Sequence, residues 1–419
     1  MTKKIKPQTL KGFRDFLPKD MVIRQKVIET LKIVFESYGF EPLETPALEY
    51  ADTLLGKSGK EAEKLMYLFK DSGGRDVGLR YELTISLARV MAQYPNIPLP
   101  FKRYQMQPVW RAEKPQKGRY REFLQCDVDI MGTTSFLADA EIIEIIYQSI
   151  IALGFKKFVI KINNRKLLFK LMEDANVPKE KRLATLISID KLGKNGRDKV
   201  ETELILKGLP KENINKIFNL ISKIKPDETL EEIFRTFESS KIPKEYFQFD
   251  PTLVRGLDYY TGPIYEAIVE KPKIGSIAGG GRYDKLISNL GGPDIPATGV
   301  SFGLDRICDV IKEQNLWPNL SPTPTKVLIS VFSPEYLENS IEIANKLRAE
   351  SIPTELYLDP ETKLDKQLKY ASKKGIPYVI IAGPEEIKAG KSTIKAMKTG
   401  KQETVFLARA IEIIKKNVS

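Results

Sequence analysis

One stretch indicates the fold more clearly than any other: Arg119-Tyr120-Arg121-Glu122-Phe123-Leu124-Gln125-Cys126-Asp127-Val128-Asp129-Ile130. The even positions from Leu124 to Ile130 are apolar, whereas the odd positions carry arginine, phenylalanine, glutamine and aspartate. This alternation predicts a β-strand, because successive side chains of a strand point to opposite faces of its sheet. One face of the strand should therefore pack on a core while the other face is polar.

The polar face has two interpretations. It is commonly the solvated outer face of a sheet. It also suits a nucleotide site, because guanidinium groups pair with phosphates, a phenyl ring stacks on a base, and amide and carboxylate groups hold a small polar ligand. The side chains on this face are Arg119, Arg121, Phe123, Gln125, Asp127 and Asp129.

The segment before this strand predicts its hairpin partner. Residues 101–111 are strand-like, and the basic loop Lys114-Pro115-Gln116-Lys117-Gly118 follows them. Two antiparallel strands of this kind could hold a nucleotide against the sheet, with the tip of the loop touching a polyanion.

Further from this hairpin, the pattern predicts an α/β protein. Helical periodicity extends over 20–38 and 139–153, and strands return over 253–303. The Pro- and Thr-rich segment 321–325 predicts a linker, beyond which strands and helices alternate. We expect an α+β core in two parts (1–165 and 246–320), a Lys- and Glu-rich helical insertion (166–245) and a small C-terminal α/β domain (326–419).

Composition excludes several kinds of chemistry. The 419 residues include no histidine and two cysteines. Ser-His-Asp and Cys-His catalysis, an imidazole general base and His-containing zinc sites are therefore excluded. Acid–base work falls to carboxylates, lysine, tyrosine or the substrate. Cys126 and Cys308 lack CxxC spacing, so they predict neither a zinc site nor a disulfide framework.

The charge distribution suggests an acidic partner. The formal charge is +12, and residues 363–416 hold 13 Lys and Arg against 5 Asp and Glu, a local charge of +8. A solvated lysine-rich face and a nucleic-acid-binding surface both explain this concentration. Residues 1–6 lack the apolar segment of a signal peptide and the sequence contains no apolar run of 18 residues, so we expect a cytoplasmic protein without membrane association.

Three further motifs are rich in glycine, arginine and tyrosine: Arg255-Gly256-Leu257-Asp258-Tyr259-Tyr260-Thr261-Gly262, Ala278-Gly279-Gly280-Gly281-Arg282-Tyr283-Asp284 and Thr298-Gly299-Val300-Ser301-Phe302-Gly303-Leu304-Asp305-Arg306. Consecutive glycines let a backbone approach a ligand closely, although these match neither the dinucleotide-binding fingerprint nor the P-loop. The third motif is typical of a strand entering a helix. Its Arg306 lies in the first helical turn, where the helix dipole favours a phosphate.

In this order the motifs resemble those of the histidyl-tRNA synthetases, which are class II aminoacyl-tRNA synthetases. Gly12-Phe13-Arg14-Asp15 is similar to the opening of the family, and helix 20–38 with Glu44-Thr45-Pro46 is similar to class II motif 1. Residues 101–125 resemble motif 2, and residues 299–306 resemble motif 3. The runs RGLDYYT and AGGGRYD resemble two signatures peculiar to the histidyl branch, and they make the resemblance specific over nearly the whole chain.

The resemblance implies a fold and a reaction. The fold is an antiparallel sheet flanked by helices, with a helical insertion between motifs 2 and 3 and a C-terminal α/β anticodon-binding domain. L-histidine and ATP, with Mg²⁺ as the counter-ion of ATP, give histidyl-adenylate and pyrophosphate, and the histidyl group then passes to the 3′ end of tRNA(His). Motif 1 implies a homodimer. No organic cofactor is implied, and no residue is assigned to a metal.

The resemblance also assigns residues to histidine. Glu82 and Thr84 would hold its ammonium group, and Arg111 would bind its carboxylate together with the α-phosphate. Arg255 would stabilise charge at the α-phosphorus, so Arg111 and Arg255 are the candidate catalytic residues. The remaining candidates around the amino acid are Gln125, Asp129, Tyr259, Tyr260 and Tyr283, with Tyr260 and Tyr283 approaching the imidazole.

Other residues are assigned to ATP and tRNA. Glu113 would meet the adenine, and Phe123 would stack on it. Arg119 and Arg306 would hold the γ-phosphate, and Gln116 would touch the acceptor end of the tRNA. Two departures from the family pattern are Ala112 and Leu124, which stand where some bacterial members carry histidines.

Several alternatives can be weighed from the sequence. A catalytically silent regulatory paralogue usually lacks the anticodon domain and the ATP-binding arginines, which this chain has. Another class II synthetase should not carry both histidyl signatures, and a plain RNA-binding module does not explain the polar strand. A class I synthetase is excluded because its HIGH signature needs histidine. The absence of histidine itself has competing explanations: synthesis when histidyl-tRNA is scarce, engineered removal, or a proteome-wide shortage.

Overall fold

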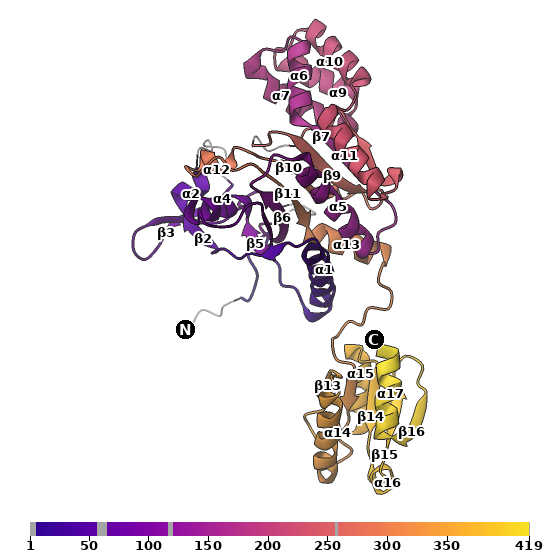
Figure 1. Ribbon diagram of the computed structural model, residues 1–419. Helices are drawn as coiled ribbons and strands as arrows, with labels where there is room; N and C mark the ends of the chain where they lie inside the picture. Colours follow the sequence, from indigo (N-terminus) through magenta and orange to yellow (C-terminus); the bar gives the residue numbers. More distant parts are fainter. Residues whose placement is uncertain (1–5, 57–64, 116–119, 256–258, 419) are drawn as a thin grey trace. The chain divides into compact units, whose positions relative to one another are not determined.

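The computed structural model describes residues 6–56, 65–115, 120–255 and 259–418 (Figure 1). The chain forms two compact units. The first comprises residues 1–15 and 26–316, and the second comprises residues 16–25 and 317–419. Among the helices of these described ranges, none combines the length and the apolar character that crossing a bilayer requires.

A large sheet forms the centre of the first unit, and eight of its strands lie in the described ranges. In spatial order they are β1 (Glu41–Pro42), β5 (Phe101–Trp110), β6 (Glu122–Met131), β11 (Ala297–Gly303), β10 (Ser276–Arg282), β9 (Pro263–Val269), β7 (Phe158–Asn164) and β8 (Phe247–Phe249). β1 and β8 pair in parallel with their neighbours, and the other pairings are antiparallel. The predicted α/β fold class, with a central sheet flanked by helices, is confirmed.

Strand β6 follows the alternation of the sequence. Its even side chains Cys126, Val128 and Ile130 are buried on the face that three helices cover. These helices are α1 (Pro18–Ser37), α5 (Phe136–Ala152) and α13 (Leu304–Gln314). Phe35 of α1 packs there with its ring centroid 5.5 Å from that of Phe302 on β11. The odd residues of β6 are left to the opposite face.

A three-stranded antiparallel sheet lies beside the large one. It has the order β2 (Leu48–Tyr50), β4 (Asp76–Leu79) and β3 (Tyr67–Lys70), with helices α2 (Ala51–Leu55), α4 (Thr84–Gln93) and α12 (Leu286–Asn289) nearby. Arg80 joins the two sheets: its guanidinium donates to the carbonyl oxygens of Pro46 (3.0 Å) and Pro108 (2.9 Å). This anchor fixes the segment that leads from β4 into α4.

A group of helices follows β7 and forms one end of the first unit (Figure 1). They are α6 (Arg165–Asp174), α7 (Lys179–Ile189), α8 (Leu192–Asn195), α9 (Arg197–Leu206), α10 (Lys211–Lys223) and α11 (Glu228–Ser239), and the short 3-10 helix Lys244–Tyr246 comes next. Helix α11 packs against α5. The buried apolar side chains of α6, α7, α9 and α10 form one cluster with Leu253, Tyr260 and Tyr283, so these helices support the segment around residue 255.

The second unit contains a five-stranded sheet in the order β13 (Thr354–Leu356), β12 (Val327–Ile329), β14 (Tyr378–Ile381), β15 (Lys391–Ala396) and β16 (Gln402–Phe406). Its helices are α14 (Leu337–Ala349), α15 (Leu364–Lys374), α16 (Pro384–Lys388) and α17 (Leu407–Val418), with a 3-10 turn at Pro334–Tyr336. β12, β13 and β14 are parallel, whereas β14, β15 and β16 are antiparallel. The predicted C-terminal α/β fold is confirmed.

Candidate functional site

The polar face of the large sheet lines a cavity of about 620 Å³ in the first unit. The described candidate residues all border it: Glu82, Thr84, Arg111, Glu113, Phe123, Gln125, Asp129, Arg255, Tyr259, Tyr260, Tyr283 and Arg306. Gln116 and Arg119 lie outside the described residues. The structure therefore gathers residues from distant parts of the sequence around one cavity.

Strand register builds the floor of this cavity. Gln125, Asp127 and Asp129 of β6 stand opposite Gly303, Ser301 and Gly299 of β11, respectively. The small residues of β11 leave room above the sheet for the longer side chains of β6. A Cβ atom at position 299 would lie 1.9 Å from Oδ1 of Asp129, so only glycine fits there without displacing the carboxylate.

Asp129 is held by two buried neighbours. Its Oδ2 lies 2.7 Å from Nη2 of Arg103, whose side chain is fully buried, and its Oδ1 accepts a hydrogen bond from the hydroxyl of Tyr283. Burial raises the pKa of Asp129, and the positive charge of Arg103 opposes this effect. Both oxygens of Asp129 are therefore engaged by the protein.

Three other side chains of the floor have oxygens that accept no hydrogen bond from the residues that the structure describes. They are Oε1 of Glu82, Oδ1 of Asp127 and Oε1 of Gln125, and all three are buried. The Nε2 of Gln125 donates to Ser301 Oγ at 3.1 Å, so the free oxygen of its amide is left for a ligand. Unpaired buried acceptors are costly, so this arrangement suits a ligand rich in N–H donors.

The carboxyl groups of the floor also resist ionisation. Burial raises the pKa of Glu82 to about 7, although the nearby Arg111 acts in the opposite direction. Burial likewise raises the pKa of Asp127. A bound cation would favour the ionised carboxylates, so the electrostatics of this end of the cavity select positively charged groups.

Tyrosines form one wall near these carboxyl groups. The ring centroids of Tyr259 and Tyr260 are 4.9 Å apart, and those of Tyr259 and Tyr283 are 5.8 Å apart. Burial raises the pKa of each of these hydroxyls, which therefore stay protonated near neutral pH. The wall offers flat rings and neutral hydroxyl groups to a small aromatic ligand.

Arg255 has an unusual backbone conformation. Its φ is 57°, a region that non-glycine residues seldom adopt and that is often found at functional sites. Nη1 of its guanidinium lies 3.1 Å from Oε1 of Glu266 on β9. The preceding residue is tied down as well, because the Val254 N–H donates to Asp190 Oδ1 at 3.1 Å. These bonds direct the guanidinium into the cavity, where it could meet a phosphate.

Two other arginines of the described residues also line the cavity. Arg111 donates from Nε to the carbonyl oxygen of Tyr81 (3.1 Å), and its guanidinium carbon lies 5.0 Å from the ring centroid of Phe123. Arg306, in the first turn of α13, donates to the carbonyl oxygen of Ser276 at 2.7 Å. Arginines beside an aromatic ring and a helix N-terminus are suited to a nucleotide.

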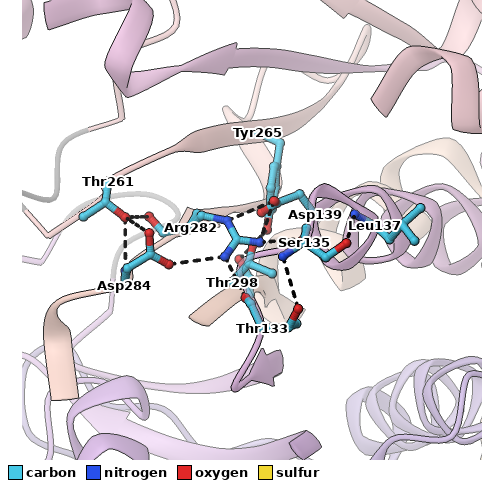
Figure 2. A network of polar contacts seen from close by, with 10 residues as sticks. Thr133, Ser135, Leu137, Asp139, Thr261, Tyr265, Arg282, Asp284 and Thr298 are labelled. Atoms are coloured by element: carbon cyan, nitrogen blue, oxygen red, sulfur yellow. Dashed lines mark hydrogen bonds and ion pairs between the residues drawn. The ribbon is translucent and has the colours of Figure 1, made fainter. Parts of the chain in front are cut away.

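A network of polar contacts surrounds the buried Arg282 (Figure 2). The guanidinium of Arg282 donates to Asp139 Oδ2 (2.9 and 2.7 Å) and to the carbonyl oxygens of Thr133 and Ser135. It also donates to Asp284, which accepts a hydrogen bond from the hydroxyl of Thr261. Because Arg282 and Thr261 adjoin Tyr283 and Tyr260 in sequence, the network fixes both tyrosines relative to helix α5.

One residue of the predicted polar face serves a different purpose. Arg121 does not border the cavity: its guanidinium donates to the carbonyl oxygens of Glu113 (3.1 Å) and Lys11 (3.3 Å). Its interpretation as a phosphate-binding group is therefore wrong. Arg121 immediately precedes the first residue of β6, and from there its long side chain reaches the N-terminal segment of the chain.

The sequence pattern missed some residues of the site. Arg103 and Ser301 contact the floor through strand pairing, which no local pattern reveals. One feature of the sequence could have marked Arg103 as a candidate, because it is a charged residue within a run that otherwise predicts a strand. Glu266 was also missed, and its contact with Arg255 depends on the packing of β9 against β10.

Two family models and several curated proteins match the chain over most of its length. A family model described as Histidyl-tRNA synthetase matches residues 12–307, and one described as Anticodon binding domain matches residues 326–417. Among curated proteins, the chain is 41% identical to "Histidine--tRNA ligase" of Cytophaga hutchinsonii, covering 95% of this chain and 97% of that protein. It is also 41% identical to "Histidine--tRNA ligase" of Aeropyrum pernix, covering 98% of each.

A solved structure gives the same result. The crystal structure of histidyl-tRNA synthetase from a Nostoc species matches with a TM-score of 0.88 and 31% sequence identity. The match covers 99% of this chain and 100% of that one. The similarity therefore includes both compact units of the chain.

Proposed function

Because the chain belongs to the histidyl-tRNA synthetase family, we propose that its cavity joins histidine to ATP and then passes the histidyl group to tRNA(His). The chain is an aminoacyl-tRNA synthetase, a ligase. One observation carries the assignment of the reaction to this cavity: within the described ranges, three arginines line it together with buried acceptor oxygens that lack a hydrogen-bond partner there. The acceptors fit an amino acid with several N–H groups, and the arginines fit a triphosphate.

The amino acid occupies the end of the cavity formed by Glu82, Gln125 and the tyrosine wall. The ammonium group lies against Glu82 and Thr84, whose position at the start of α4 is fixed by the Arg80 anchor. The imidazole lies among the tyrosines. This placement is supported by the free oxygen of Glu82 and by the stacking surface that the tyrosine rings provide.

ATP occupies the opposite end. Arg111 contacts the α-phosphate and the histidine carboxylate, Phe123 stacks on the adenine beside Glu113, and Arg306 holds the γ-phosphate. Arg119 is assigned to the γ-phosphate and Gln116 to the acceptor end of tRNA by resemblance. We assign Mg²⁺ to the phosphates as the counter-ion that accompanies ATP, and we assign it no protein ligand.

The first step is an in-line displacement. A carboxylate oxygen of histidine attacks the α-phosphorus, the bond to the bridging oxygen of the β-phosphate breaks, and pyrophosphate leaves. Arg255 and Arg111 stabilise the negative charge that develops on the α-phosphate oxygens. The fixed backbone of Arg255 favours this role, because preorganised donors need little reorganisation during the reaction.

The second step forms the ester. A hydroxyl of the terminal tRNA ribose attacks the histidyl carbonyl carbon, AMP leaves, and a phosphate oxygen of the adenylate accepts the proton. This choice of base suits a chain without histidine. The lysine-rich surface of residues 363–416, within the region matched by the anticodon-binding family model, binds the other end of the tRNA.

The enzyme also acts as a homodimer in this proposal. Large apolar side chains are exposed on the small sheet: Leu48, Tyr50 and Phe69. Such a group favours association with a second copy, in agreement with the motif 1 role implied by the sequence. We place the enzyme in the cytoplasm, and we keep 1–165, 166–245, 246–320 and 326–419 as the proposed domain boundaries.

Pyrophosphate exchange tests the function. Exchange of labelled pyrophosphate into ATP should require L-histidine, and Arg255→Ala should reduce its rate by two orders of magnitude or more, roughly the effect of losing one preorganised oxyanion donor. Arg235→Ala is the matched control, because Arg235 is exposed and pairs only with the neighbouring Glu232 among described residues. Exchange driven by another amino acid, or full activity in Arg255→Ala, contradicts the proposal.

A further inference from the structure

The backbone that precedes Arg255 is held by side chains at the start of the insertion helices α6 to α11. The amide of Asn163, on β7, donates to the carbonyl oxygen of Leu253 at 3.0 Å. The guanidinium of Arg165, the first residue of α6, donates to the carbonyl oxygen of Val254 at 3.4 Å. Both side chains are buried at the point where the chain leaves the large sheet for the insertion. This junction therefore fixes the two residues before Arg255.

The same junction also holds the far end of the motif that begins with Arg255. The backbone N–H of Arg165 donates to the carbonyl oxygen of Gly262, the last residue of that motif, at 2.9 Å. The φ of 57° at Arg255 is seldom adopted and persists only where the surrounding structure fixes it. The bonds to residues 253, 254 and 262 provide this fixation.

A further contact comes from within the insertion. Asp190 is the C-cap residue of α7, and its Oδ1 accepts a hydrogen bond from the Val254 N–H at 3.1 Å. The helix dipole disfavours a carboxylate at a helix C-terminus, so α7 by itself does not account for an aspartate there. Asp190 is exposed, whereas Val254 is buried. The carboxylate thus joins the surface of the insertion to the backbone next to Arg255.

We propose that Asp190 is a positioning residue for the formation of the adenylate. By accepting the Val254 N–H, it keeps Arg255 in its uncommon conformation and its guanidinium in the cavity. This inference rests on the proposed role of Arg255 at the α-phosphate. The insertion then contributes to the chemistry through the backbone, although no described residue of helices α6 to α11 borders the cavity.

Two substitutions of Asp190 separate positioning from folding. Asp190→Ala removes the acceptor, whereas Asp190→Asn keeps a carbonyl oxygen and removes only the charge. The thermal midpoint should change by a few degrees at most in both variants, because the side chain is exposed and its charge opposes the helix dipole. The kcat of pyrophosphate exchange should fall about tenfold or more in Asp190→Ala, because a small misplacement of a catalytic group has an effect of this size.

The rescue and the Michaelis constants make the result specific. In Asp190→Asn the kcat should stay within about threefold of wild type, and the KM values for histidine and ATP should change less than about threefold in both variants, because Arg255 acts in the transition state. Asp174→Ala, at an exposed aspartate of α6, is the matched control and should leave kcat unchanged. An unchanged kcat in Asp190→Ala, an equal loss in Asp190→Asn, or a change confined to KM would overturn the proposal.

A double-mutant cycle shows whether Asp190 acts through Arg255. In the Arg255→Ala background, Asp190→Ala should cause no further loss of kcat, because the guanidinium that it positions is gone. Losses that multiply would overturn the proposal. Wild-type protein without histidine-dependent exchange, or full activity in Arg255→Ala alone, would instead contradict the proposed function, so the two failures are distinguishable.

Discussion

Gly279 leaves the space that the guanidinium of Arg255 occupies. A Cβ atom at position 279 would lie 2.2 Å from Nη1 of Arg255, which is far inside van der Waals contact. The two residues come from different signature motifs of the sequence, so one motif makes room for the functional group of the other.

Gly279→Ala should therefore reduce catalysis without unfolding the protein. The new methyl group displaces only the end of a flexible arginine side chain, so the thermal midpoint should fall by a few degrees at most. The kcat of pyrophosphate exchange should fall by at least tenfold, because the guanidinium leaves its position. In Gly193→Ala, where a Cβ meets nothing within 4 Å, both quantities should stay near wild type.

Replacement of Arg282 should destabilise the protein. Arg282→Met leaves the fully buried Asp139 without its ion-pair partner, which typically costs about 3–5 kcal/mol. The double variant Arg282→Met/Asp139→Leu should recover much of this free energy of unfolding, because no unpaired charge then remains buried. Denaturant titration measures both. Equal stability of the single and double variants would contradict the importance of the ion pair.

The pH dependence of histidine binding should reflect Glu82. With its pKa raised to about 7, the free enzyme loses the carboxylate needed for the ammonium as the pH falls below 7. The KM for histidine should therefore rise as the pH falls towards 6. Because the imidazole of the substrate also titrates in this range, the KM of an analogue with a non-titrating ring provides the correction. In Glu82→Gln the KM should be high and the corrected profile flat.

The same carboxyl group should also make the free energy of unfolding depend on pH. Histidine binding weakens as the pH falls, whereas this contribution to stability is lost as the pH rises. A raised pKa means that the folded state binds the proton of Glu82 more tightly than the unfolded state does. The stabilisation that this proton gives the folded state is complete below about pH 4.5 and is lost as the pH rises to about 7. Glu82→Gln should therefore be more stable than wild type at pH 8, by up to about 3 kcal/mol. The difference should disappear near pH 4, and thermal denaturation at the two pH values checks this.

The exposed apolar side chains of the small sheet predict a dissociable dimer. Leu48→Glu together with Phe69→Glu should convert the proposed dimer to a monomer of 47.6 kDa in sedimentation experiments. Leu206→Glu, on the insertion helix α9, replaces an even more exposed leucine and should leave the dimer intact. A wild-type protein that sediments as a monomer would refute this prediction.

Sequence periodicity predicted the strand on which the site is built. The alternation within residues 119–130 depends only on local geometry, so β6 and its two faces follow directly from it. The pairing of Asp129 with Arg103 could not be predicted, since it depends on which strand lies beside β6 and in what register. Arg121 shows the limit of the pattern. Period two assigns it to the same face as Asp129, but it lies just before the strand, and its guanidinium donates a hydrogen bond to the N-terminal segment.

In the second unit, the pattern predicted alternating strands and helices after residue 325, and β12 and β14 are short apolar runs. β15 and β16 were missed because most of their residues are polar, and most side chains of β16 are exposed. Their pairing in a hairpin supplies the backbone hydrogen bonds that hold them. A polar edge of this kind gives little hydrophobic signal, and tertiary context decides its structure.

The alternation of β6 also has a genetic consequence. An in-frame insertion or deletion of one codon within residues 122–131 would move every later side chain of the strand to the other face. Cys126, Val128 and Ile130 would enter the cavity, and the acidic residues would enter the apolar core. In the turn between β15 and β16 the same change alters only a loop. In-frame insertions and deletions in this gene should therefore be tolerated in the turn between β15 and β16 and not within β6.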